Sequence, residues 1–169
     1  MEQVIALLTQ WLYFLPAEDS EGEVVTPTAI NNYVRLKIMP APNKKKYSRI
    51  HMAYLVMICT LKQSVSIAHV QKMIPMGLTE DEVKAVYSDY AEKHREATLC
   101  FIDQVRAQSK AILDEENKSE NAVENLVTSF AVQAGYAKLM TEKIVKLREA
   151  DSQAVLNAEV ENKNSKENA

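Results

Sequence analysis

The sequence predicts an all-α protein in which a compact N-terminal domain is followed by a long antiparallel pair of helices. Three observations favour this fold class: the 169 residues include only three glycines, apolar residues recur at helical spacing, and hydroxyl residues stand at the expected helix starts. A chain of this length suffices for one compact domain with an extension. We expect domains over residues 1–76 and 77–156, followed by a disordered tail over residues 157–169, which lacks apolar periodicity.

Four helices are expected in the N-terminal domain, each marked by its own start or stop signal. They cover residues 2–15, 27–37, 49–63 and 67–74. Pro16 ends the first helix, whereas Thr26 offers a hydroxyl cap to the second helix and Pro27 provides its first residue. Ser48 and Ser66 cap the third and fourth helices. The segment between the second and third helices contains two prolines, so we expect an extended or hairpin-like connection there.

Two longer helices are expected in the C-terminal half. The first begins after Thr79, where three successive carboxylates favour the positive end of a helix dipole, and it fades within residues 114–118. The second begins at Ser119 and carries apolar residues at helical spacing as far as Leu147. A short polar loop makes the two helices an antiparallel pair. Their apolar stripes can be covered by each other, by the N-terminal domain or by a second subunit.

Charge is divided unevenly along the chain. The net charge is −3, yet residues 24–79 contain no Asp or Glu and carry eight basic side chains. The rest of the chain holds the other 12 basic residues and all 23 acidic residues, which gives a net charge of −11. Such a division favours a basic binding surface attached to an acidic body over chance segregation on a solvated surface.

The short helix over residues 27–37 has two different faces. At about 100° per residue, Ile30, Tyr33 and Val34 share a narrow arc that is expected to face a core. The opposite face and its flank consist of residues whose side chains can pair with base edges and phosphates: Thr28, Asn31, Asn32 and Arg35. These residue types also occupy ordinary solvated faces. The acid-free surroundings and the nearby "KKKY" segment favour a helix that reads DNA.

The stretch "INNYVRLKIMPAPNKKKYSRIHMAYL" resembles a bacterial family, domain of unknown function 1836, whose members are regarded as MerR-like transcriptional regulators. It is similar to the MerR-type pattern, in which a capped helix with an Ile and a Tyr leads to a proline turn, a basic wing and an apolar helix. Ile30 and Tyr33 match the core of the recognition helix, and residues 44–47 match the wing with its aromatic anchor. The resemblance covers residues 24–75 and implies a MerR-like winged helix-turn-helix.

Three features depart from the MerR-type pattern. Asn31 stands in place of an arginine that grips a phosphate, and Lys37 stands in place of a frequent glycine. The usual first element of the helix-turn-helix is not recognisable. We therefore expect the helix over residues 2–15 to support the recognition helix across a longer polar loop.

Together, the residues and the resemblance predict a sequence-specific DNA-binding transcriptional regulator. The second helix is expected to enter the major groove of double-stranded DNA while the basic wing binds flanking phosphates. The expected DNA-binding residues are Thr28, Asn31, Asn32, Arg35, Lys37, Lys44, Lys45, Lys46, Tyr47 and Arg49. Of these, Tyr47 is expected mainly to anchor the wing. A homodimer is expected because a two-fold reader matches a palindromic site, although helical bundles commonly satisfy such stripes within one chain.

Other classes of function find less support in the sequence. An enzyme is not expected, because the chain has no Gly-rich phosphate loop, no nucleophile elbow and no carboxylate or histidine pair at catalytic spacing. Cys59 and Cys100 lie far apart without nearby His partners, so no metal, cofactor or disulfide framework is expected. The N-terminal residues lack a secretory signal and the most hydrophobic run is too short to span a bilayer, which predicts a cytoplasmic protein without a membrane partner.

Two alternatives stay open. The main alternative function is a helical protein–protein interaction adaptor with a basic docking face for an acidic partner. A small-molecule effector of the regulator is also conceivable, although the sequence does not identify one. The aromatic residues that are candidates for lining an effector pocket are Tyr87, Tyr90, Phe101, Phe130 and Tyr136. Aromatic residues at helical spacing more often belong to a core.

Overall fold

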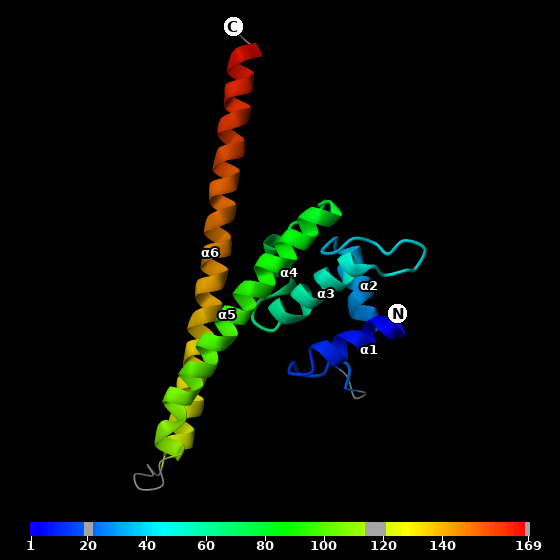
Figure 1. Cartoon of the computed structure of the whole chain (residues 1–169). Helices are drawn as coiled ribbons and strands as arrows, with labels where there is room; N and C mark the ends of the chain where they lie inside the picture. The colour runs from blue at the N-terminus through cyan, green and yellow to red at the C-terminus, as the bar shows by residue number, and fades with distance from the viewer. Residues whose placement is uncertain (19–21, 114–120, 168–169) are drawn as a thin grey trace.

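The computed structural model of the protein describes residues 1–18, 22–113 and 121–167. These residues form six α-helices and no β-strand (Figure 1). The helices are α1 (Glu2–Trp11), α2 (Pro27–Arg35), α3 (Arg49–Leu61), α4 (Ile67–Met73), α5 (Glu80–Leu113) and α6 (Ala122–Glu167). The all-α class expected from the sequence is confirmed.

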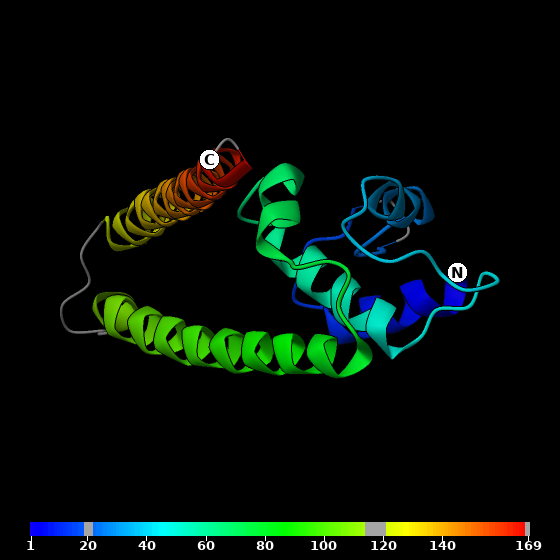
Figure 2. The same ribbon diagram turned by 90° about the horizontal axis from the view of Figure 1, so that it is seen from above.

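The first four helices and the start of α5 share one hydrophobic core. Each helix contributes at least one buried side chain, with Leu8 from α1, Ile30 from α2, Leu55 from α3, Val70 from α4 and Val83 from α5. α2 and α5 lie on opposite sides of α3 (Figure 2). Because α2 packs on the core through one face only, its other face is left for solvent or a ligand.

The start of α2 is set by its own sequence, as expected. The Thr26 hydroxyl accepts a hydrogen bond from the Ala29 N–H at 3.1 Å, and Pro27 is the first helical residue. The helix ends at Arg35, two residues before the expected end. There the Ile38 N–H donates to the Tyr33 carbonyl at 3.0 Å, a bond typical of the Schellman motif that closes helices.

The expectation that α1 continues to residue 15 is wrong. The helix ends at Trp11, and the chain then turns, with the Leu15 N–H donating to the Leu12 carbonyl at 2.8 Å. A residue that precedes a proline is disfavoured in the α-helical region, which excludes Leu15 from the helix. The turn brings Leu12 into the core, while Trp11 remains 51% exposed.

Side-chain contacts join the second half of α5 to the first third of α6. Phe101 packs on Phe130 with 5.6 Å between ring centroids, and the Gln104 side chain is hydrogen-bonded to Gln133. Beyond these contacts the two helices diverge (Figure 1). α6 then crosses α4, where Val145 is buried. The expected start of this helix at Ser119 lies outside the described residues.

α6 extends to Glu167. The disordered tail expected over residues 157–169 stays a prediction. The domain boundaries drawn from the sequence stay a prediction.

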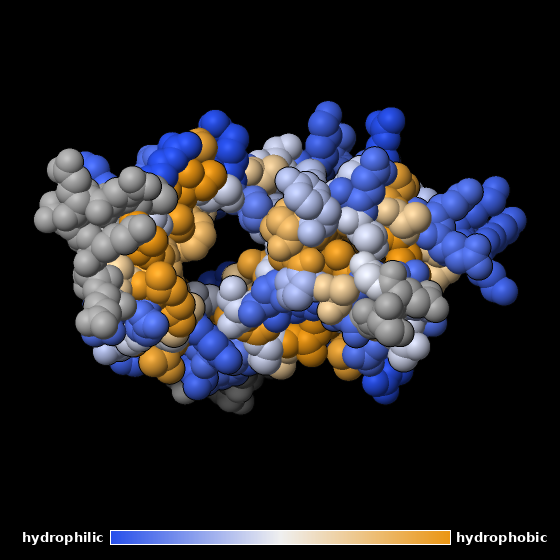
Figure 3. Space-filling view, turned by 90° about the horizontal axis from the view of Figure 1, so that it is seen from below, coloured by the Kyte–Doolittle hydropathy of each residue, from blue (hydrophilic) through white to orange (hydrophobic). Residues whose placement is uncertain are grey.

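The helical arm, which we define as residues 92–113 and 121–167 of α5 and α6, leaves many apolar side chains exposed. The large exposed ones are Leu99, Phe101, Ile102, Val123, Val127, Val132, Tyr136, Leu139, Met140, Ile144 and Leu147. Figure 3 shows an opening between this arm and the N-terminal domain, with hydrophobic atoms on both sides of it. Among the described helices, none combines the length and apolar character required to cross a membrane.

Candidate nucleic-acid interface

The outward face of α2 carries the polar residues expected from the helical wheel. Thr28, Asn31 and Arg35 are exposed and Asn32 is half-buried. The Arg35 guanidinium donates from Nη2 to Asn32 Oδ1 at 2.7 Å. This bond restricts the arginine side chain before any ligand arrives, so less conformational entropy is lost when it binds. Both groups keep further hydrogen-bonding capacity for a base edge or a phosphate.

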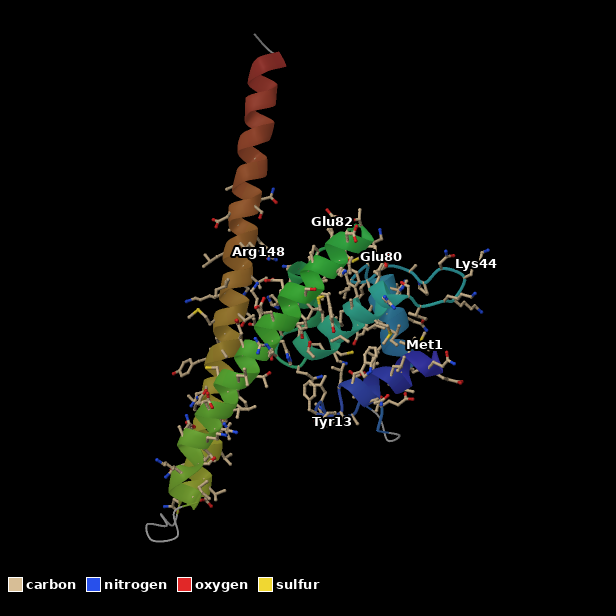
Figure 4. All side chains as sticks on the ribbon, in the orientation of Figure 1. Met1, Tyr13, Lys44, Glu80, Glu82 and Arg148 are labelled. Carbon is tan, nitrogen blue, oxygen red and sulfur yellow. The ribbon has the colours of Figure 1, made fainter. Side chains whose placement is uncertain are left out.

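A tight turn carries three of the expected lysines. The Lys46 N–H donates to the Asn43 carbonyl at 2.8 Å, and these two residues form an isolated antiparallel bridge. The two residues between them, Lys44 and Lys45, have φ values of 46° and 63°. Two successive residues with positive φ are typical of a type I′ reversal. Figure 4 shows Lys44 at the tip of this loop, directed away from the helices.

The lysine turn is not extended into a β-hairpin. Within the described residues, the loop between α2 and α3 contains the single bridge at the turn and no strand on either side of it. The basic wing expected from the sequence thus takes the form of a loop that relies on side-chain contacts for its position.

Backbone strain coincides with the expected DNA-binding lysines. Among the described residues other than glycine, positive φ occurs only at Lys37, Lys44 and Lys45. A left-handed conformation costs a residue with a Cβ atom about 1–2 kcal/mol, which glycine would avoid. Such outliers cluster at functional sites. Here the left-handed residues belong to the Schellman ending of α2 and to the type I′ turn.

His51 anchors the loop to α3. The residue is only 7% exposed, and its Nδ1 accepts a hydrogen bond from the Ser48 N–H at 3.0 Å. The ring proton is therefore assigned to Nε2, which lies 3.2 Å from the Ala41 carbonyl and donates to it. One side chain thus caps the start of α3 and ties down the loop that precedes the lysine turn.

The sequence interpretation did not include His51 in the site. A signal for it was present, because a Ser followed three residues later by a side chain that can accept a hydrogen bond is the spacing of a capping box. The bond to the Ala41 carbonyl, formed across ten residues, has no counterpart in the sequence pattern.

Tyr47 packs against the same histidine. Its ring meets the His51 ring edge-on, with 5.5 Å between the centroids, and the side chain is half-buried. Burial raises the pKa of the Tyr47 phenol. These contacts agree with its expected role as an anchor of the loop.

The basic residues of residues 24–79 fall into two groups. Lys62 forms an ion pair with Glu18, and Lys72 Nζ lies 2.7 Å from a carboxylate oxygen of Glu149. The remaining six form no ion pair within the described residues: Arg35, Lys37, Lys44, Lys45, Lys46 and Arg49. All six belong to the expected DNA-binding set. They lie on α2, at Lys37 just after it, on the lysine turn and at the start of α3.

We also looked for metal-binding groups and reactive cysteines in the described part of the chain. No group of three or more His, Cys, Asp or Glu side chains is placed there to hold a metal ion. Cys59 is buried, and burial raises the pKa of its thiol to about 11, whereas Cys100 is exposed.

Comparison with known proteins identifies the N-terminal part of the chain. The family model described as Domain of unknown function (DUF1836) matches residues 1–91, which include the whole of α1 to α4, the first turns of α5 and every expected DNA-binding residue. No curated protein and no solved structure matches the chain. Since the family model covers more than half of the 169 residues, the chain belongs to the DUF1836 family.

Proposed function

We propose that the protein is a sequence-specific DNA-binding transcriptional regulator of the MerR-like winged helix-turn-helix type. The observation that carries this proposal is a set of six basic side chains, from Arg35 to Arg49, that form no ion pair within the described residues. Cations without ion-pair partners favour the binding of a polyanion such as DNA, because each phosphate that they neutralise releases counterions. A cytoplasmic location is part of the proposal.

The two parts of the surface have different tasks. α2 lies in the major groove, where Arg35 pairs with guanine and Asn31 or Asn32 pairs with adenine. The lysine turn and Arg49 contact the flanking phosphates, which supply affinity but no sequence preference. His51 and Tyr47 hold the turn at a fixed distance from α2.

The helical arm forms the interface between the two subunits of the regulator. Val132, Tyr136, Leu139, Met140 and Leu147 follow one another at helical spacing on α6, and all are at least half exposed. Such an exposed apolar stripe is a suitable core for a protein–protein interface. A homodimer formed through this stripe presents two copies of α2 to a two-fold DNA site.

Fluorescence anisotropy tests the proposal directly. The purified protein is titrated into a labelled duplex from upstream of its own gene, at several salt concentrations and with unrelated competitor DNA. A sequence-specific regulator binds with a steep salt dependence and resists the competitor. If no complex forms even at low salt, the DNA-binding proposal fails.

Arg35 variants separate sequence reading from charge. Arg35→Ala is expected to reduce discrimination against a base that replaces the guanine by about 1–3 kcal/mol, because alanine has no donor for the base edge. Arg35→Lys keeps donors but loses the planar fork of the guanidinium, so we expect a smaller loss of discrimination. Arg35→Lys keeps the charge and therefore also keeps the salt slope of the native protein. An equal loss of affinity on matched and mismatched duplexes would contradict a reading role for Arg35.

A protein-interaction adaptor is the second candidate, and the exposed apolar side chains of the arm favour it. In that case the six unpaired cations dock an acidic protein surface. The same titration decides between the two, since an adaptor of this kind shows no preference for one duplex over another.

A further inference from the structure

A groove runs along the side of α3 that faces away from α2. Its walls come from α1, α3 and α5, and its volume is about 750 Å³. A smaller depression of about 260 Å³ shares Trp11, Val56 and Tyr87 with it. The main groove falls within the size range of small-molecule sites, which is roughly 300–1,000 Å³.

Aromatic and aliphatic side chains form the walls of the groove. Trp11 of α1 faces it with half of its surface exposed, and Tyr87 of α5 forms part of another wall. Ala53 and Val56 of α3 line it as well, and the small Ala53 side chain leaves room above that helix. Indole and phenol rings favour stacked or edge-on contacts with another aromatic ring. The walls therefore favour a flat aromatic ligand.

The charges around the groove balance. Arg49 and Lys84 carry positive charges, Glu80 and Asp81 carry negative ones, and none of the four forms an ion pair within the described residues. Figure 4 shows Glu80 at the start of α5. A ligand with a net charge gains from one pair and loses to the other. We propose that this groove binds an uncharged aromatic small molecule.

A ligand in the groove also contacts residues next to the proposed DNA-binding surface. This part of the inference rests on the proposed function. Tyr47, Ser48 and Arg49 line the groove, and they also lead out of the lysine turn. Ser48 and Tyr47 contact His51, which holds the loop through the Ala41 carbonyl. A ligand that packs against these residues favours one position of the turn and thereby changes the affinity for DNA.

A matched pair of dyes tests the ligand class. N-phenyl-1-naphthylamine is uncharged, and 8-anilinonaphthalene-1-sulfonate carries the same ring system with a sulfonate. Trp11 is the single tryptophan of the chain, so its emission reports on this groove. We expect saturable binding of the uncharged dye and protection of Trp11 from acrylamide quenching. Tighter binding of the sulfonate would overturn the assignment of an uncharged ligand.

Variants test the location. Ala53→Phe fills the groove from α3 and is expected to weaken binding of the uncharged dye about tenfold or more, whereas Tyr13→Ala changes an aromatic residue that is 83% exposed and lines none of the described grooves. Ala53→Met provides a smaller filling side chain if the phenylalanine disturbs folding, which circular dichroism reveals. Unchanged dye binding in a folded Ala53 variant overturns the site.

The link to DNA is measured separately, by anisotropy with the duplex used above, with and without saturating uncharged dye. We expect a several-fold change in DNA affinity that Ala53→Phe abolishes. Dye binding in the groove without any change in DNA affinity overturns the regulatory part of the inference. If the protein binds no DNA at all, the proposed function fails, while the dye titration still decides whether the groove is a ligand site.

Discussion

The N-terminal domain and the helical arm use apolar residues in opposite ways. Among the described side chains, every buried apolar residue except Val145 lies between Val4 and Val83. In the arm, large apolar side chains such as Tyr136 and Leu139 are more than half exposed. The hydrophobic effect therefore stabilises the first region within one chain, whereas the arm leaves large apolar side chains exposed. The expected DNA-binding residues lie on the N-terminal domain, whose hydrophobic core is buried within one chain.

The largest expected effect comes from a buried leucine of the N-terminal domain, and an exposed leucine of the arm is its control. Leu55→Ala removes a fully buried side chain of α3 and is expected to lower the free energy of unfolding by about 2–5 kcal/mol. Leu139→Ala removes a side chain of α6 that is 62% exposed, so we expect a change below about 0.5 kcal/mol. Urea unfolding at low protein concentration measures both.

Protein concentration sharpens this comparison. If a second copy covers the arm, the effect of Leu139→Ala grows with protein concentration, because assembly then contributes to stability. The effect of Leu55→Ala stays the same. A large cost of Leu139→Ala that is independent of concentration would show that the arm is packed within one chain.

The same two regions show which structural features can be predicted from one sequence. The start of α2 is predictable because Thr26 and Pro27 act on their own backbone. The course of α6 depends on distant partners, such as the contact of Glu149 with Lys72. Helical spacing predicts which residues share a face, but it does not indicate that α6 leaves α5 and crosses α4. Tertiary packing decides such cases.

Three lysines in each region provide the second comparison. Replacement of Lys44, Lys45 and Lys46 by Ala is expected to reduce DNA affinity on every duplex about 10- to 100-fold at low salt, and to lower the salt slope by up to about 3. The control replaces Lys138, Lys143 and Lys146 of α6, which are also exposed. It removes the same charge from the arm and should leave the slope unchanged. Equal losses in both triple variants would mean that only net charge matters.

Two histidines with similar local bonds provide the third comparison. His51→Ala removes the acceptor for the Ser48 N–H and the donor to the Ala41 carbonyl, so stability is expected to fall by about 1–2 kcal/mol and DNA affinity several-fold. In α4, His69 makes a comparable contact, with its Nδ1 2.8 Å from the Ser66 hydroxyl, but it has no bond to the loop. His69→Ala should leave DNA affinity unchanged. Anisotropy on both variants shows whether the loop contact matters.

The candidate site was predictable only where neighbouring residues define it. The face of α2 follows from helical geometry, and the lysine turn follows from two prolines and a run of like charges. The anchor at His51 was missed because its partner, the Ala41 carbonyl, is a backbone atom that any residue would provide. The left-handed conformation of Lys37 could be suspected from its place after α2, where glycine is preferred, but not the strain at Lys44 and Lys45.

The smallest effect is expected from replacing a cysteine. The reaction rates of the two cysteines compare the buried core with the exposed arm. Burial raises the pKa of Cys59 from 9.0 to about 11, so at pH 8 only about one molecule in a thousand carries the reactive thiolate, and the side chain is also inaccessible. Cys100 is exposed on the arm. With a thiol-reactive disulfide reagent we expect one fast thiol per folded chain at pH 8 and two after unfolding. Cys100→Ser should abolish the fast phase. A second fast thiol in the folded protein would contradict a closed core around α3, whereas a slow Cys100 would indicate that another molecule covers this part of the arm.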